Sequence, residues 1–320
     1  MSQRSAVPYT VEPAPRPARR LRRARLARGA APYLLLLPAL AVIVAVLGYP
    51  LVKLVTLSFQ DYGLFELIAG EGSWIGVENY REIFGDRRFW VVLLRTVAFT
   101  AVTVGLTMVL GTLIALLLAR LGRAMRLLIT TGLVLVWSMP PVVSVNIWSW
   151  MVDYEFGVLN WTLSQLGLEY FDRHDWFVNP LEGFAVITAI VVWGAIPFVA
   201  ITVYAGLTQL SAEVVEAAAI DGAGAYRTFR DITLPLLKPT FVILASLSVI
   251  WNFQVFSQIW IIRNARPEDH YFLLSIYSFV ESFNASRYGL GSAIAMVMVL
   301  AMLGVTFVYI RQMVRIGQID

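Results

Sequence analysis

The stretch that decides the fold runs from Glu213 to Pro239 and reads EVVEAAAIDGAGAYRTFRDITLPLLKP. It is a polar connection between two long apolar runs. Ser211 is a good N-cap for a first helix that continues to residue 220, with acids in its first turns. Glycines at 222 and 224 allow a sharp turn. A second short helix over residues 226–234 should end at the prolines that follow. We therefore expect a helix–turn–helix on one surface, which we call the knob (residues 209–239).

The chain around the knob is too apolar for an ordinary soluble domain. Its 320 residues are 58% hydrophobic and 14% charged, whereas soluble domains carry about 25% charged residues. Six runs are long enough to cross a bilayer core of ~30 Å, which takes ~20 helical residues. These runs are residues 32–59, 91–119, 127–152, 184–207, 240–262 and 290–310. A further apolar patch, residues 271–280, is too short to span, so we expect it to be interfacial or an extension of the sixth span.

The distribution of charge predicts the orientation of these six spans. Basic residues gather in the first 31 residues, after the second span, after the fourth span and at the C-terminus. Acids dominate residues 61–88 and 153–182. The positive-inside rule then places both termini in the cytoplasm and the acidic loops outside. We expect residues 1–31 to be a disordered basic cytoplasmic tail and residues 32–320 to be one all-α transmembrane domain. The basic run at residues 19–28 is interpreted as a topology determinant, with a lipid anchor or twin-arginine signal as alternatives.

The inventory of reactive groups excludes several classes of protein. The chain has no cysteine and only two histidines, His174 and His270, so thiolate chemistry and a multi-histidine metal site are not expected. Its two lysines do not follow a glycine, so it contains no phosphate-binding loop and is not a self-contained ATPase of that type. An intramembrane enzyme is not favoured, because it would need a catalytic constellation in the spans. An ion-coupled carrier is less favoured, because it would need titratable groups in the spans.

The knob resembles the EAA loop of binding-protein-dependent ABC importer permeases. The matching positions are Glu216, Ala217, Ala218, Asp221, Gly222, Ala223, Phe229, Ile232, Leu234, Pro235 and Pro239. Segments near residues 76–90, 137–160, 193–198 and 251–256 resemble the sugar-importer (MalF/UgpA-like) branch, so the similarity covers residue 32 to the C-terminus. One departure is the segment from Arg263 to Asp269, where that branch usually has a Gly-Gly-Pro loop.

The resemblance implies a MetI-like permease bundle that performs no chemistry of its own. The knob would be the coupling helix that sits in a groove of the ATPase subunit, with Glu216 facing a basic residue there. ATP and magnesium would be bound by two partner ATPase subunits. The other expected partners are a second homologous permease, as a heterodimer, and an extracytoplasmic solute-binding protein. The location would be the bacterial cytoplasmic membrane.

Polar and aromatic residues inside the spans predict where a solute passes. Polar groups at membrane depth usually face the bundle interior or a watery path, and rings beside amides suit a neutral polyhydroxyl solute. The alternative is structural, because Asn and Gln also join helices and Trp forms interfacial belts. The candidates are Asn146, Trp150, Trp193, Trp251, Asn252, Gln254 and Gln258, with Pro140, Pro141 and Pro197 as hinge or kink residues.

The expected solute is a carbohydrate, with an oligosaccharide favoured. A polyol or a glycerol phosphate remains an alternative within the same importer architecture, and an ion-coupled carrier is the alternative outside it. The histidines in the outer loops suggest either a docking surface for the solute-binding protein or ordinary solvated loops.

Overall fold

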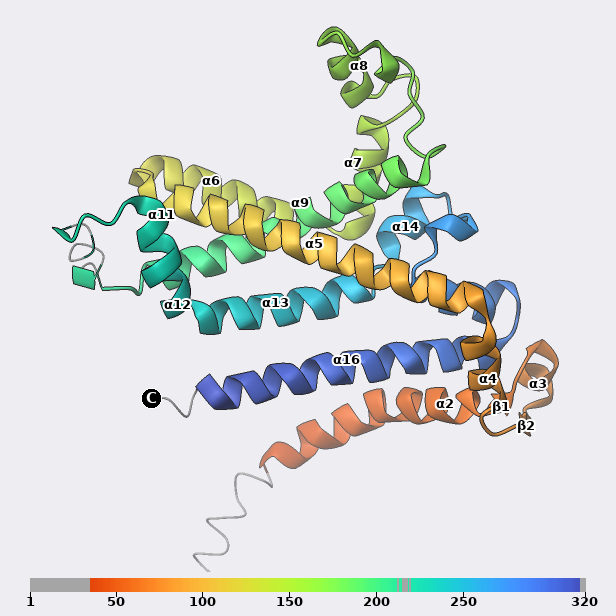
Figure 1. Cartoon of the computed structure of the whole chain (residues 1–320). Helices are drawn as coiled ribbons and strands as arrows, with labels where there is room; N and C mark the ends of the chain where they lie inside the picture. The colour runs from red at the N-terminus through yellow and green to blue at the C-terminus, as the bar shows by residue number, and fades with distance from the viewer. Residues whose placement is uncertain (1–34, 212, 215–217, 219, 317–320) are drawn as a thin grey trace, which may run out of the picture. The chain divides into compact units, whose positions relative to one another are not determined.

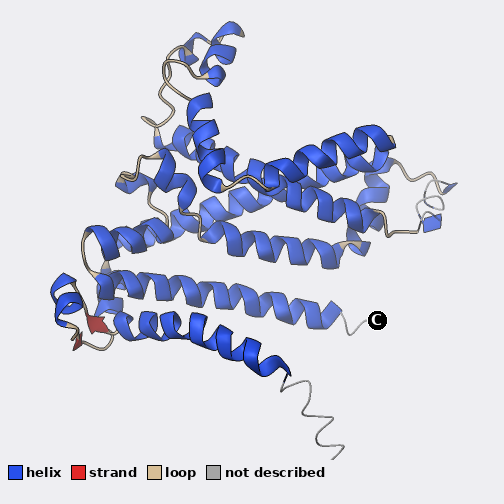
Figure 2. Cartoon of the chain, turned by 180° about the vertical axis from the view of Figure 1, so that it is seen from behind, coloured by secondary structure: helices blue, strands red, loops and turns tan. Residues whose placement is uncertain are grey.

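The computed structural model describes residues 35–211, 213–214, 218 and 220–316. The described chain is almost entirely helical, with one small pair of strands (Figure 2). It divides into two units, residues 1–53 and residues 54–320. The first described helix begins at Leu35 and passes through a π-helical turn (Val44–Gly48) into α2 (Tyr49–Ser58), and the division between the two units falls inside α2.

The second unit begins with the last residues of α2, and a short segment that is tied to the end of α2 follows. It contains β1 (Gln60–Asp61), α3 (Leu64–Ala69), β2 (Ser73–Trp74) and α4 (Glu78–Gly85), and the two strands pair antiparallel. The side-chain amide of the buried Asn79 donates to the carbonyl oxygens of Ser58 and Gln60, at 3.1 and 2.9 Å. These bonds fix the chain where it leaves the first apolar run.

The helices of the bundle follow in order. They are α5 (Arg87–Arg120), α6 (Arg123–Trp137), α7 (Pro141–Met151), α8 (Val158–Gln165), α9 (Pro180–Leu207), α11 (Ala225–Thr228), α12 (Leu234–Leu236), α13 (Lys238–Phe253), α14 (Ser257–Ile262), α15 (Leu274–Phe279) and α16 (Tyr288–Ile316). Figure 1 places α11 and α12 at one end of this unit and α8 at the other.

Four of the described helices are long and apolar enough to span a membrane, and two bent helix pairs bring the number to six if each pair is one span. The prolines at 140 and 141 break the third apolar run, as predicted, because α6 and α7 meet at 102°. The fifth run differs from the prediction. Instead of one helix to residue 262, α13 ends at Phe253 and α14 resumes at Ser257. At its other end, α13 meets the segment Ala225–Leu236 at 75°.

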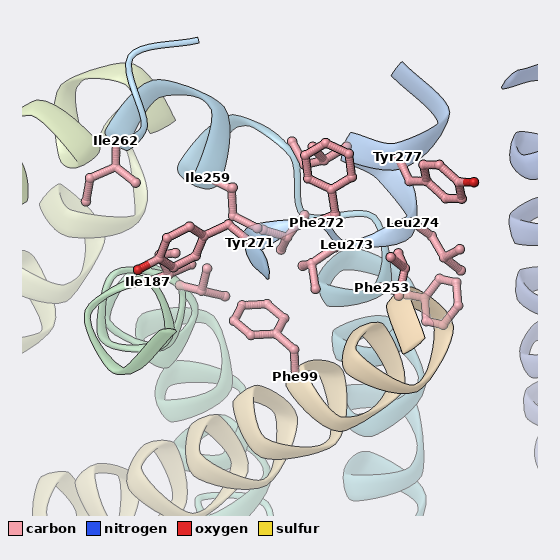
Figure 3. Close-up of a cluster of buried hydrophobic side chains, with 14 of the residues drawn as sticks. Phe99, Ile187, Phe253, Ile259, Ile262, Tyr271, Phe272, Leu273, Leu274 and Tyr277 are labelled. Carbon is pink, nitrogen blue, oxygen red and sulfur yellow. The ribbon is translucent and has the colours of Figure 1, made fainter. Parts of the chain in front are cut away.

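The bundle core forms where α5 and α9 cross and where the segment after α14 packs on them (Figure 3). A Cβ atom at Gly111 of α5 would lie only 2.7 Å from Cγ1 of Val199, so the two backbones approach closely there. The short apolar patch predicted to be interfacial is instead part of this core. Tyr271, Leu274 and Ile276 are fully buried, and α15 is a separate helix from α16.

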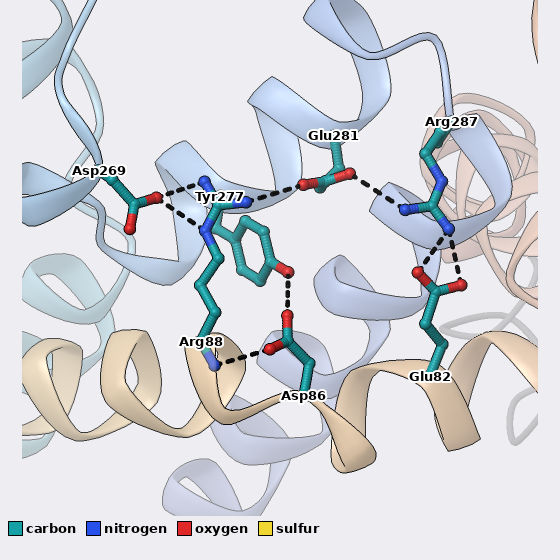
Figure 4. A network of polar contacts seen from close by, with 7 residues as sticks. All are labelled: Glu82, Asp86, Arg88, Asp269, Tyr277, Glu281 and Arg287. Carbon is teal, nitrogen blue, oxygen red and sulfur yellow. Dashed lines mark hydrogen bonds and ion pairs between the residues drawn. The ribbon is translucent and has the colours of Figure 1, made fainter.

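A network of charged side chains joins α4 and α5 to the segment before α16 (Figure 4). Arg88 pairs with Asp269 and with Glu281, and its guanidinium lies 4.9 Å from the centre of the Tyr277 ring. Arg287 bonds Glu82 and also lies near Glu281. Burial raises the pKa of Glu281 above its usual value, although both arginines act in the opposite direction. Burial and the neighbouring carboxylates also raise the pKa of Tyr277 to about 12.

Candidate functional site

The turn at the centre of the knob is a helix C-cap built on glycine. Ala218 and Ile220 are helical, and the backbone N–H of Ala223 donates to the carbonyl of Ala218 at 2.9 Å. Gly222 has φ +76°, which is the left-handed conformation. Together these form a Schellman motif, in which the residue after the helix must adopt positive φ. The predicted sharp turn is therefore present, and glycine is the residue that it requires.

The second half of the knob differs from the single helix predicted over residues 226–234. It consists of α11, a π-helical turn over Phe229–Thr233, and α12. Asp231 pairs with Arg230 at 2.7 Å and lies 3.8 Å from Arg227. The hydrogen bond from Arg230 lowers the pKa of Asp231, so this carboxylate stays ionised on the exposed rim.

The knob rests on the bundle through a few apolar side chains. Leu237 is buried beside Ala115 and Val199. Tyr226 and Phe229 line an apolar groove of about 460 Å³ against the end of α5. Ile220 and Tyr226 are nevertheless 86% and 75% exposed. Exposed apolar surface beside a charged rim is typical of a protein–protein interface.

The predicted coupling residues are only partly described. Glu216 and Ala217 lie outside the described residues. Asp221 and Gly222 are exposed, Ala218 is buried, and Ile232 and Phe229 are half-buried. Leu234 and Pro235 are exposed on α12. The structure therefore brings Asp221, Gly222 and Leu234 to the surface of the knob.

Three aromatic side chains from different helices form a cluster that we call the aromatic platform: Trp137 of α6, Phe198 of α9 and Trp251 of α13. Trp137 stacks on Phe198 with ring centres 6.0 Å apart, and Trp251 meets Phe198 edge-on at 5.2 Å. The two tryptophans remain 56% and 47% exposed. The platform lies where α6 ends, directly before the 102° bend. A second pair, Trp148 and Trp193, meets at 6.2 Å.

The candidate amides do not form the continuous stripe that the sequence predicted. Gln254 is exposed at the break after α13, so Trp251, Gln254 and Gln258 do not share one unbroken helix. Asn252 is only 4% exposed and its amide donates to the carbonyl of Ser248, so this candidate faces the core.

The remaining candidates on α7 and α9 each lie within one continuous helix. Asn146 and Trp150 are exposed on α7. Pro197 is buried inside α9, which runs through it as one helix from Pro180 to Leu207.

Two residues of the aromatic platform, Trp137 and Phe198, were not among the solute-path residues predicted from the sequence. Trp137 and Phe198 belong to segments that resemble the sugar-importer branch, and Phe198 directly follows Pro197. The position of Phe198 next to Pro197 was the feature of the sequence that could have indicated it. The contact itself joins three distant parts of the chain and has no local pattern.

The segment between α7 and α9 is held by specific side-chain bonds. Asn160 receives a hydrogen bond from the Trp176 indole at 2.6 Å and donates to the carbonyl of His174. His174 Nε2 lies 2.7 Å from a carboxylate oxygen of Glu182. His174 is therefore half-buried in a cluster of aromatic side chains that includes Tyr170 and Trp176.

Arg263 stabilises the segment from Arg263 to Asp269, which stands where the sugar-importer branch usually has a Gly-Gly-Pro loop. Arg263 lies over the rings of Phe177 and Tyr271, at 4.9 and 5.1 Å from their centres, and donates to Glu268 at 2.9 Å. This hydrogen bond lowers the pKa of Glu268. Asn264 and Ala265 take positive φ in the turn between Arg263 and Glu268.

The fold and the site define a multi-pass helical membrane protein with a surface knob between two spans. The family model for binding-protein-dependent transport system inner membrane components matches residues 107–316. The chain belongs to this family, and it is a non-catalytic permease subunit of an ABC transport system in the inner membrane. The resemblance inferred from the knob is confirmed, and the carrier and enzyme alternatives are set aside.

Several characterised proteins are similar over most of the chain. The diacetylchitobiose uptake system permease protein DasB of Streptomyces coelicolor is 44% identical over 292 residues, covering 91% of this chain and 89% of that protein. The trehalose/maltose transport system permease protein MalF of Thermococcus litoralis is 33% identical over 282 residues, covering 87% and 92%. A crystal structure of a bacterial alginate ABC importer matches with a TM-score of 0.76 at 19% identity, covering 92% of this chain and 99% of that chain, and confirms the fold.

Proposed function

We propose that this permease carries a carbohydrate, including oligosaccharides, into the cytoplasm. The observation that supports this proposal is the aromatic platform, which presents two exposed tryptophan rings beside a broken span. Aromatic faces pack on the apolar C–H faces of a sugar, while amides such as that of Gln254 can bond its hydroxyls. The names of the relatives, a diacetylchitobiose system and a trehalose/maltose system, are consistent with this class of solute.

The same proposal assigns the energy source to other chains. Two ATPase subunits would bind ATP and magnesium, and the knob, including Glu216, would dock on them through Ile220, Tyr226 and the Asp231 rim. A second homologous permease would complete a heterodimer, and a solute-binding protein would deliver the solute from outside. Transport requires that two states of the bundle differ in affinity for the ATPase and for the loaded receptor. The bend between α6 and α7 and the break between α13 and α14 are the places where those states can interconvert.

The proposed topology keeps six spans within residues 32–320, with both termini cytoplasmic and residues 1–31 as a basic tail. Because the chain has no cysteine, single cysteines introduced one at a time can test this topology through their accessibility to a membrane-impermeant reagent. The loop at residues 153–182 should react from outside, and the knob only from inside. Reaction of both from the same side would contradict this topology.

The class of solute is tested first through its binding to the solute-binding protein. Calorimetry of the solute-binding protein against sugars, polyols and glycerol phosphates should show binding of a sugar. Binding of a polyol or a glycerol phosphate alone would replace the carbohydrate by that alternative without affecting the family assignment.

The platform is tested by transport. Phe198→Leu and Trp251→Leu should each raise the apparent KM for uptake about two- to tenfold, because one aromatic contact contributes about 0.5–1.5 kcal/mol. Phe307→Leu on the exposed face of α16 is the matched control and should leave KM unchanged. If the platform variants lose thermal stability while uptake per folded molecule is unchanged, the rings are structural.

A further inference from the structure

An apolar groove of about 640 Å³ lies between α5 and α9, away from the aromatic platform. Its lining includes Val102, Leu106 and Leu110 of α5 and Leu181 and Val192 of α9. Leu181 is 80% exposed, and the three α5 residues are also exposed. Of the described residues that line the groove, Arg95 alone carries a charge.

The groove is separate from the proposed solute path. On α9 its lining residues Ala185, Thr188 and Val192 recur at three- and four-residue spacing, so they share one face. Each residue turns the helix by about 100° about its axis. Measured from Val192, Trp193 therefore points about 100° to one side of that face, and Phe198 points about 120° to the other side. The groove therefore opens on a side of α9 that the platform does not occupy.

Arg95 lies at one end of the groove and keeps part of its guanidinium unused. Its Nη1 donates to the carbonyl oxygens of Asp269 and Phe272, both at 3.0 Å, which fixes the side chain in place. The nearby carboxylate of Asp269 is bonded by Arg88 instead. Within the described parts of the chain, Arg95 has no carboxylate at ion-pair distance, and no hydrogen bond is formed by its Nε or Nη2.

The groove is long enough to take an acyl chain of one leaflet. From residue 95 to residue 110 a helix rises about 22 Å at 1.5 Å per residue. Half of a ~30 Å hydrocarbon core is ~15 Å, which is shorter than this part of α5. An acyl chain whose headgroup lies beside Arg95 can therefore follow the groove through one leaflet. Guanidinium groups bind phosphate with paired, charge-assisted hydrogen bonds.

We propose that this groove binds an anionic phospholipid, with the phosphate on Arg95 and an acyl chain between α5 and α9. The fixed cation at the mouth of an otherwise apolar, membrane-depth groove argues for this occupant. An apolar helix of another subunit would cover the apolar lining but would leave the charge of Arg95 unmatched.

The test uses the whole transporter with its partner subunits, in phosphatidylcholine nanodiscs that contain phosphatidylglycerol with a photoreactive acyl chain. Mass spectrometry should find label on α5 between residues 98 and 110. Unlabelled phosphatidylglycerol should compete, and phosphatidylcholine should not. Arg95→Gln should lower labelling about tenfold, the effect of one charge-assisted hydrogen bond. Arg87→Gln, two turns away on the exposed side of α5, is the matched control and should label normally.

A second variant separates binding from folding. Ala98→Trp fills the groove but keeps Arg95 and its two carbonyl contacts, so it should abolish labelling in a folded transporter. Four results would overturn the proposal. They are equal labelling by a phosphatidylcholine probe, normal labelling of Arg95→Gln, competition by inorganic phosphate alone, and labelling only in the isolated chain. The last result would mean that a partner subunit covers the groove.

Discussion

Replacing Gly222 by alanine should weaken coupling to the ATPase through backbone strain alone. Gly222 adopts φ +76° in the Schellman turn, and no described atom lies within 4 Å of an added Cβ. The substitution therefore introduces no clash, but an L-residue with a Cβ pays roughly 1–2 kcal/mol in this conformation. If that strain opens the turn, the population of the docking-competent knob falls about 5- to 30-fold.

The assay is receptor-stimulated ATPase activity of the reconstituted transporter, together with the affinity of the ATPase subunit for the permease. Gly224→Ala is the matched control, because Gly224 has φ −69° and open space around it, so it should behave as wild type. Gly222→Asn should recover most of the activity, because asparagine tolerates positive φ. The reasoning fails if Gly222→Ala matches the Gly224 control, or if asparagine at 222 is as harmful as alanine.

Three further substitutions test the fold that positions the site. Gly183→Ala should cost about 1–3 kcal/mol of stability, because its Cβ would lie 2.1 Å from the hydroxyl of the buried Tyr271. Adding Tyr271→Phe to this variant should recover part of the lost thermal stability. If there is no recovery, this clash is not the cause of the loss. Arg126→Met should lower the melting temperature, because Arg126 donates to two carbonyls at the end of α5, at 3.0 and 2.6 Å; an unchanged melting temperature would show that the cap is dispensable. Glu281→Gln should remove a loss of stability as pH rises, because burial raises the folded pKa of Glu281. The loss runs from the ordinary pKa of the unfolded chain up to the raised pKa of the folded state, since the unfolded chain releases this proton first. Parallel melting curves across pH for both proteins would contradict the raised pKa.

The sequence was sufficient for features that depend on local pattern. Hydropathy located the four long apolar helices of the described residues, because ~20 apolar residues in succession have few structural solutions other than a span. The paired prolines at 140 and 141 located the break between α6 and α7, since proline removes a backbone donor. Glycine spacing located the turn at Gly222.

The features that the sequence missed depend on tertiary contacts. The patch at residues 271–280 is equally apolar whether it lies at an interface or in the core, and only the contacts of Tyr271 and Leu274 place it inside. The break after Phe253 is held from outside the helix, where the Ser275 hydroxyl donates to the carbonyl of Val255. The aromatic platform joins α6, α9 and α13, so no window of sequence contains it.

The central claim is that this permease uses ATP hydrolysed by other chains to move a carbohydrate. The direct measurement is uptake of a labelled chitin or maltose oligosaccharide into proteoliposomes that contain this chain, its partner permease and the ATPase subunits, with the loaded receptor added outside. Accumulation should require both receptor and internal ATP, and Glu216→Lys or Gly222→Trp should abolish it while membrane insertion stays normal. Accumulation driven by an ion gradient without ATP, or undiminished uptake in both knob variants, would contradict the account.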